Sequence, residues 1–206
     1  MYLILKNTLD RFLAFFLFIT LIIIPIIPIT ILAIWIEDPG DVFYLQDRVG
    51  LNGKKFKVIK FRSMYKDADQ RIKESINSGK TDRLNFKEHS QSMTTKVGKV
   101  IRKLSIDELP QLWNVLKGEM SFVGPRPERE FFIQQLEKEI KYYNLRHTVK
   151  PGLTGWAQVM YPYGASVEDA YRKLQYDLYY IKNHDLLFDV KVLLKTVNIV
   201  IFGKGR

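Results

Sequence analysis

The stretch FLAFFLFITLIIIPIIPITILAIWI, residues 12–36, contains no charged residue over 25 positions. Helices buried in soluble proteins are seldom this long and this uniformly apolar, so the stretch predicts a segment that inserts into a membrane. A cleaved signal peptide would have an apolar run of roughly 7–15 residues that ends in small residues. Here the run is longer and ends in WIEDPG, which argues against a signal peptide.

Two prolines, Pro25 and Pro28, interrupt the middle of this stretch. Each lacks an N–H group, so we expect a strong kink in the helix. The arms, residues 12–24 and 26–36, would each reach about 16–20 Å as helix, whereas the hydrocarbon core is about 30 Å thick. The stretch is therefore compatible with a re-entrant helix and with an ordinary kinked span, since prolines are tolerated in transmembrane helices.

The composition of the whole chain limits its partners. A net charge of +10 over 206 residues favours anionic partners such as nucleic acid, acidic lipid or phosphorylated small molecules. The absence of cysteine excludes disulfides, thiolate metal sites and a cysteine nucleophile. A basic run follows the apolar stretch and, by the positive-inside rule, places the main domain in the cytosol; its residues are Lys54, Lys55, Lys57, Lys60 and Arg62.

Local patterns predict an α+β fold that is mostly helical. Residues 41–64 read as a β-hairpin, with β-branched and aromatic flanks and a turn at Asn52-Gly53. Residues 97–102 are compatible with a short helix or a strand. Residues 129–143 predict an amphipathic helix with Phe132, Ile133, Leu136 and Ile140 on one face. We expect two domains: a membrane helix over residues 1–37, and a catalytic domain over residues 38–206 with a variable surface insertion at 65–95.

The C-terminal segment, residues 186–206, repeats apolar residues at helical spacing, namely Leu187, Val190, Leu194, Val197 and Ile201. One interpretation is that this face packs on the core. The other is that the helix lies in the membrane interface, with Lys204 and Arg206 near acidic lipid.

Two adjacent carboxylates, Asp107 and Glu108, stand out in SIDELPQLWNVLKG, residues 105–118. With Ser105 they form an S-x-x-E capping box, although Pro110 would then fall at the fifth helical position, where its missing N–H costs a hydrogen bond. In either register both carboxylates lie near a helix N-terminus, which favours their ionised form. An ionised carboxylate can serve as a nucleophile or as a magnesium ligand.

Cations and a third carboxylate accompany this pair. Arg102 precedes it, Arg126 lies between Pro125 and Pro127 on a stiff loop suited to bidentate phosphate binding, and Lys150 precedes a rigid Pro-Gly turn. Asp177 lies among tyrosines and, taken alone, reads as a structural hydrogen-bonding residue. His147 and His184 lack a metal-binding spacing and are interpreted as solvated or core residues.

Several long motifs, in order along the chain, resemble the bacterial sugar transferases, the monotopic phosphoglycosyl transferases that act on polyprenyl phosphate. The motifs are KFRSM (60–64), LSIDELPQLWNVLKGEMSFVGPRP (104–127), VKPGLTGWAQV (149–159) and YDLYYIKN (176–183). The resemblance covers nearly the whole chain. It implies transfer of a sugar-1-phosphate from a UDP-sugar to a polyprenyl phosphate such as undecaprenyl phosphate, with UMP release, at the start of surface-glycan or exopolysaccharide synthesis.

The resemblance also implies roles for single residues. Asp107 matches the nucleophile that forms a phosphoryl-aspartate, and Glu108, with Asp107 beside it, would hold Mg²⁺. Arg102 and Arg126 match arginines linked to phosphate binding, and Asp177 matches a further acidic position. We group Lys60, Arg62 and Lys150 with the substrate-binding residues. The resemblance favours a re-entrant N-terminal helix, attached to the bacterial inner membrane, with the active site on the cytoplasmic face.

Two departures from the family's pattern concern the N-terminus. The family often has a basic pair before an aspartate, whereas here Lys6 is followed by Asn7, and Asp10 matches the aspartate. The helix break commonly reads Ser-Pro, whereas here it is Ile24-Pro25. These departures concern headgroup anchoring and the position of the break, not the carboxylate pair.

Two other classes of protein were compared with the sequence. A membrane-tethered binding module for acidic lipid or nucleic acid would leave the paired carboxylates unexplained, and we do not expect a nucleic-acid partner. A bitopic protein with a spanning helix differs in topology only. A homodimer is compatible with the sequence, although no residue argues for it.

Overall fold

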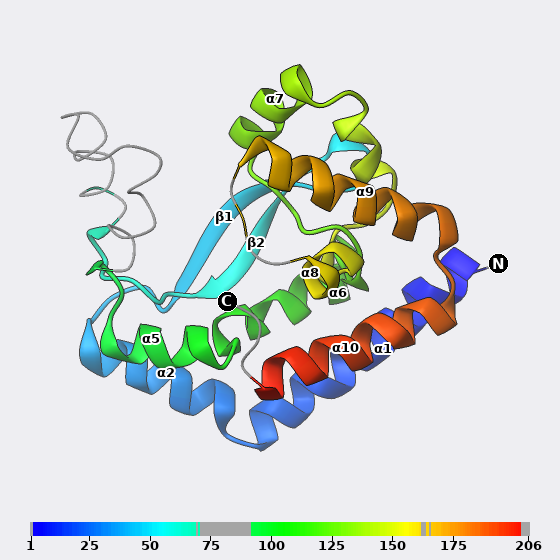
Figure 1. Cartoon of the computed structure of the whole chain (residues 1–206). Coiled ribbons are helices and arrows are strands. Elements are labelled where there is room, and N and C mark those ends of the chain that lie inside the picture. The colour runs from blue at the N-terminus through cyan, green and yellow to red at the C-terminus, as the bar shows by residue number, and fades with distance from the viewer. Residues whose placement is uncertain (1, 69, 71–91, 162–163, 165, 203–206) are drawn as a thin grey trace. The chain divides into compact units, whose positions relative to one another are not determined.

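The computed structural model describes residues 2–68, 70, 92–161, 164 and 166–202 (Figure 1). Most of the predicted insertion at residues 65–95, and the basic residues Lys204 and Arg206, lie outside the described residues. Within them the chain is mostly helical with small two-stranded sheets, which confirms the predicted fold class. The chain forms two compact units: the first contains Met1–Ile19, Leu45–Ile59 and Gln111–Arg206, and the second contains Thr20–Tyr44 and Lys60–Pro110.

The N-terminal apolar segment forms two helices, α1 (Tyr2–Ile23) and α2 (Ile26–Glu37). Pro25 is the residue before α2, and its carbonyl accepts the first bond of that helix from the N–H of Ile29 at 3.0 Å. Pro28 falls in the first turn of α2, where a backbone N–H has no helical partner in any case. The structure therefore confirms Pro25 as the break, and Pro28 adds no second break.

No helix in the described ranges is by itself long and apolar enough to cross a membrane. The bent pair Tyr2–Ile22 and Ile26–Glu37 meets the length and composition of a membrane segment when the two helices are taken together.

The predicted hairpin is present as β1 (Phe43–Val49) and β2 (Lys55–Phe61), joined by a short 3₁₀ turn at Leu51–Gly53. Asn52 and Gly53 both have positive φ angles, 53° and 76°, as the turn signal predicts. β2 carries Lys60 close to its C-terminal end.

In the second unit, α5 (Lys96–Lys103) packs along α2 (Figure 1). The sequence left this segment open between helix and strand, and the structure shows a helix. Gly98 on α5 lies directly against the backbone carbonyl of Ser63. A Cβ atom at position 98 would overlap this carbonyl oxygen. A 3₁₀ helix, η2 (Ile106–Gln111), follows α5 and contains the paired carboxylates.

The first unit contains short strands that local patterns did not predict. β3 (Ser121–Val123) pairs in parallel with β4 (Gly152–Thr154). The helices of this unit after residue 111 are, in chain order, α6 (Leu112–Lys117), α7 (Glu130–Glu139), η3 (Tyr143–Thr148), α8 (Trp156–Met160), α9 (Val167–Asn183) and α10 (Leu186–Phe202).

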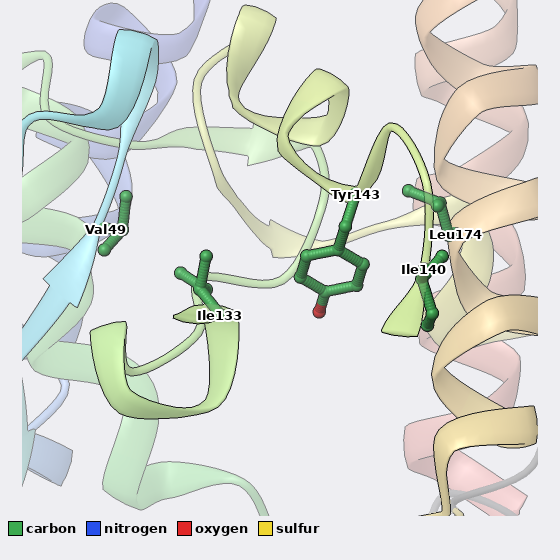
Figure 2. Packing of buried hydrophobic residues seen from close by; sticks show 5 residues of the cluster. All are labelled: Val49, Ile133, Ile140, Tyr143 and Leu174. Atoms are coloured by element: carbon green, nitrogen blue, oxygen red, sulfur yellow. The ribbon is translucent and has the colours of Figure 1, made fainter. Parts of the chain in front are cut away.

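A hydrophobic cluster of the first unit lies between α7, η3, α9 and the end of β1. It contains Val49, Ile133, Ile140, Tyr143 and Leu174, all of them buried (Figure 2). The amphipathic helix predicted for residues 129–143 is thus confirmed as α7, but its buried face is narrower than expected. Phe132, which was assigned to that face, is 42% exposed.

The C-terminal helix α10 lies beside α1 (Figure 1), and an ion pair between Lys6 and Asp189 joins them. α10 packs on the rest of the first unit through Val192 and Asp189, which are both buried. The predicted apolar stripe faces outward instead: Leu187, Val190, Leu194 and Val197 are 51–81% exposed. The interpretation in which this stripe packs on the core is therefore wrong for these four residues.

The close approach at Gly98 makes a prediction about stability. Gly98→Ala should lower the free energy of unfolding by about 1–3 kcal/mol, because the new Cβ overlaps the Ser63 carbonyl and overpacks the contact. Alanine elsewhere in a helix is favourable relative to glycine. Val100→Ala, at an exposed position of the same helix, is the control. Denaturant unfolding in detergent checks the prediction, and an unchanged or higher midpoint for Gly98→Ala would contradict it.

Candidate active site

The paired carboxylates lie in the first turn of η2, directly after a residue in the left-handed conformation. Ser105 has a φ of 57°, and its backbone carbonyl accepts from the N–H of Glu108 at 3.3 Å. A capping residue normally has extended backbone angles, so the predicted Ser105 capping box is not the geometry observed. Pro110 lies inside η2 and α6 begins two residues later, which resolves the conflict over where the helix starts.

Asp107 is buried, with 5% of its surface exposed, although it carries a carboxylate. Burying a charged group costs free energy that surrounding polar contacts must offset. The nucleophilic role that the resemblance implies for Asp107 stays a prediction. Glu108, the next residue, is partly exposed.

Lys60 contacts the carboxylate pair from β2. Its Nζ lies 2.8 Å from Oε1 of Glu108, and less than a fifth of either side chain is exposed. The structure therefore brings together Lys60, predicted to bind phosphate, and Glu108, predicted to hold a metal ion. A lysine beside a carboxylate pair is suited to a substrate that carries both phosphate and a divalent cation.

Two arginines of the second unit flank the end of β2. Arg102 donates from Nε to Ser63 Oγ at 2.7 Å and from Nη1 to Thr94 Oγ1 at 3.1 Å. Arg62 is buried and donates to the backbone carbonyl of Asp38, whose carboxylate lies 3.6 Å away. The sequence did not predict that Arg62 would hold the turn after α2.

Asp107 and Glu108 offer oxygen ligands, which are the kind of ligand that Mg²⁺ takes. Among the described residues no group of three or more Asp, Glu or His side chains is placed to hold a metal ion. Magnesium is commonly bound through one or two carboxylates together with substrate phosphates and water, which Asp107 and Glu108 match. Zinc and calcium sites usually take more protein ligands.

Two more predicted site residues lie in the first unit: Arg126 on the loop after β3, and Asp177 on α9. Arg146, on η3, donates from Nη2 to the carbonyl of Arg126 at 3.1 Å and lies 2.9 Å from Oδ2 of Asp177. Arg48 donates to the carbonyl of Pro127 at 3.0 Å. Two buried or half-buried arginines thus hold the backbone of the loop that carries Arg126.

Asp177 is 2% exposed and acts on this loop through Arg146. Burial raises the pKa of Asp177 to about 6, although the adjacent Arg146 acts in the opposite direction. Asp177 is therefore still largely ionised at pH 7 and can offset the buried guanidinium. The sequence analysis missed Arg146, because nothing in its local pattern distinguishes it from a surface arginine.

Lys150 lies next to the β3–β4 ladder and contacts α1. Its Nζ donates to Oδ1 of Asn7 at 2.9 Å, and burial, assisted by the nearby charge of Arg11, lowers the pKa of Lys150. The ladder itself is tight: the N–H of Gly124 donates to Thr154 at 2.9 Å, and a Cβ on Gly124 would overlap the carbonyl of Lys150.

A buried polar network ties α1 to the rest of the first unit. Lys6 Nζ lies 2.6 Å from Asp189 Oδ2, and the hydroxyls of Tyr2 and Tyr180 donate to the same carboxylate at 2.9 and 2.7 Å. Asp10 accepts from Ser121 Oγ on β3 at 2.6 Å. Lys6 is therefore a packing residue of this unit. The departure from the family's basic pair put headgroup anchoring by Lys6 in question, and the structure shows that the Lys6 ammonium is paired with Asp189.

His147 and His184 both lie among the described residues. The ring of His184 lies against Tyr2 and Tyr180, and its Nδ1 is 2.6 Å from the carbonyl of Ile181. Burial, with the charge of Arg146, lowers the pKa of His147 to about 4. His147 is therefore neutral at pH 7.

The comparisons with known proteins agree with this arrangement of motifs. The model of the bacterial sugar transferase family matches residues 1–203. The chain belongs to the bacterial sugar transferase family.

Curated relatives carry more specific names. A UDP-N-acetylgalactosamine-undecaprenyl-phosphate N-acetylgalactosaminephosphotransferase of Aeromonas hydrophila is 44% identical over 88% of this chain and 40% of its own length. A UDP-glucose:undecaprenyl-phosphate glucose-1-phosphate transferase of Escherichia coli K12 is 38% identical over 87% of this chain and 37% of its own length. The chain thus spans about two fifths of these relatives. An uncharacterised sugar transferase of Bacillus subtilis is 38% identical over 98% of this chain and 90% of its own length.

The Arg146–Asp177 pair makes a prediction about stability. Asp177→Asn should lower the free energy of unfolding by about 3–5 kcal/mol, because it leaves a buried guanidinium without its counter-charge. Glu168→Gln, which breaks the exposed Glu168–Arg172 pair on the same helix, is the matched control and should change stability little. Denaturant unfolding of the two variants checks this prediction, and equal stabilities would contradict it.

Proposed function

We propose that this chain transfers a sugar-1-phosphate from a UDP-sugar to a polyprenyl phosphate such as undecaprenyl phosphate. The observation that carries the proposal is the buried Asp107 next to Glu108, which is itself paired with Lys60. Family membership and the names of the relatives from A. hydrophila and E. coli support the reaction class. The product would be a polyprenyl-diphosphate sugar, the starting lipid of a surface glycan.

The reaction would proceed in two displacements at phosphorus. A carboxylate oxygen of Asp107 attacks the phosphorus that bears the sugar, and the bond from this phosphorus to the oxygen of UMP breaks, so that UMP leaves. A phosphate oxygen of the polyprenyl phosphate then attacks the same phosphorus. This second step forms the diphosphate and returns the Asp107 carboxylate without any net proton transfer.

The other residues would bind and orient the diphosphate. Lys60 and Arg102 approach from β2 and α5 and supply positive charge for its oxygens. Glu108, with Asp107, would hold Mg²⁺, which when bound neutralises the diphosphate and stabilises the leaving UMP. Arg126, whose loop is fixed by Arg146, is the proposed phosphate-binding residue of the first unit.

Membrane attachment would bring the enzyme to its lipid acceptor. We infer that the bent pair of α1 and α2 enters and leaves the membrane on one face, the cytoplasmic face of the inner membrane. The exposed apolar stripe of α10 supports an interfacial position for that helix, since an amphipathic helix binds at the headgroup boundary through such a face.

The two-step reaction predicts UMP release in the absence of acceptor. With a UDP-sugar and Mg²⁺ alone, the wild-type chain should release a burst approaching one UMP per chain, because the aspartyl intermediate accumulates. Asp107→Asn should abolish this burst, and Asp41→Asn, at an exposed carboxylate of the same unit, should retain it. UMP is measured by rapid quench against a panel of UDP-sugars that includes glucose and N-acetylgalactosamine.

These measurements test the role of Asp107 separately from the class of reaction. A burst that persists in Asp107→Asn would exclude Asp107 as the nucleophile and leave the reaction class standing. UMP release that requires the polyprenyl phosphate in the wild type would indicate direct transfer instead of a covalent intermediate.

The re-entrant topology can be tested with single cysteines, because the chain has none. Cysteines replace Thr8, on an exposed position of α1, and Glu137, on an exposed position of α7. Both should react with an impermeant maleimide from the same, cytoplasmic side of sealed vesicles. Labelling of position 8 only from the opposite side would contradict the re-entrant form and indicate a spanning helix.

A further inference from the structure

The last residue of α2, Glu37, bonds to the start of another helix. Its Oε1 accepts from the backbone N–H of Lys96 at 2.7 Å, and its Oε2 accepts from the N–H of Val97 at 2.8 Å. Lys96 and Val97 are the first two residues of α5, and they are about 60 positions away in the chain. A carboxylate from the apolar N-terminal segment therefore caps the helix that leads to Asp107.

Glu37 completes the capping of α5, because the first N–H groups of a helix have no partner within it. Thr95, the residue before α5, accepts from the N–H of Gly98 at 2.8 Å through its side chain. The backbone carbonyl of Thr95 accepts from Lys99 at 2.9 Å. Thr95 thus accepts from the third and fourth N–H groups of α5, and Glu37 accepts from the first two.

The other end of α5 is fixed against the end of β2. Arg102, in the last turn of α5, bonds to the side chain of Ser63, and the carbonyl of Ser63 accepts from the N–H of Thr95 at 3.2 Å. Gly98 permits the close contact between α5 and Ser63. Because α5 ends at Lys103, the position of this helix sets where the chain places Asp107 and Glu108.

The residue after Glu37 acts on the same region from the other side. Asp38 accepts from the backbone N–H of Lys66 at 2.8 Å and pairs with Arg62, two residues beyond Lys60. The end of α2 therefore holds both chain segments that converge on the carboxylate pair: α5 through Glu37, and the end of β2 through Asp38.

We propose that Glu37 is a positioning residue of the reaction, which couples the seating of α2 in the membrane to the placement of Asp107 and Glu108. The inference rests on the proposed function for its kinetic consequence. α5 is about 12 Å long at 1.5 Å per residue, so Glu37 acts through the helix and touches no substrate. The membrane segment is then a part of the active-site scaffold as well as an anchor.

The chain offers a matched control for simple helix capping. Thr95→Ala removes one capping bond from the same turn of α5, together with the contact of the Thr95 side chain with Glu37, but it keeps both backbone bonds from α5 to the Glu37 carboxylate. Glu37→Gln keeps the size of the side chain but replaces one acceptor oxygen with an amide that cannot accept from a backbone N–H. A local capping role predicts similar effects for the two variants, whereas coupling to α2 predicts a larger effect for Glu37→Gln.

The kinetic test measures UMP release by both variants in lipid nanodiscs. Glu37→Gln should lower kcat by roughly ten- to a hundredfold with little change in KM for the UDP-sugar, since misplacing a reacting group by about 1 Å costs on this scale. Thr95→Ala should lower kcat by less than about threefold, because the two backbone bonds from α5 to Glu37 remain in this variant. Equal losses in the two variants would overturn the proposal, as would a loss in Glu37→Gln that falls on KM alone.

Hydrogen exchange decides the inference even if the proposed function fails. A wild-type chain that releases no UMP with any sugar would count against the reaction and not against Glu37. Glu37→Gln should then still raise exchange across residues 96–110, whereas Thr95→Ala should raise it only in the first turn of α5. Exchange confined to that first turn in both variants would overturn the coupling.

Discussion

The missing N–H of Pro25 divides one apolar segment into two helices with different partners. Before the break, α1 belongs mainly to the first unit, where Lys6 pairs with Asp189 and Asp10 accepts from Ser121. After the break, α2 belongs to the second unit, where Glu37 caps α5. A continuous helix would place all these side chains on one rigid rod. The break allows each half to satisfy a separate set of polar groups, so both units depend on a membrane-type sequence for their polar contacts.

The cations near the carboxylate pair are engaged by the protein in different ways. Lys60 faces the carboxylate of Glu108 and Arg62 that of Asp38, so a phosphate must compete with an existing ion pair for either cation. Arg102 donates to the hydroxyls of Ser63 and Thr94, which orient its guanidinium.

Features set by neighbouring residues could be predicted from the sequence, and features set by distant contacts could not. The break at Pro25, the hairpin turn at Asn52-Gly53 and the helix at 129–143 all follow from local propensity or periodicity. The β3–β4 ladder could not be predicted from the sequence, because strands of three residues carry no periodic pattern. The Lys6–Asp189 pair and the role of Arg146 depend on residues far apart in the chain. Motifs marked the carboxylate pair as a candidate site, and the structure adds the contact of Glu108 with Lys60.

The β3–β4 ladder has a consequence for engineering variants of this chain. A Cβ atom on Gly124 would overlap the backbone of Gly152, and a Cβ atom on Gly152 would overlap the backbone of Gly124. A Cβ atom on Gly155 would overlap the carbonyl of Gly124. A substitution at one of these positions cannot be rescued by a compensating change at another, because each of them is already the smallest residue. Libraries of variants of this chain should therefore leave this glycine cluster unchanged.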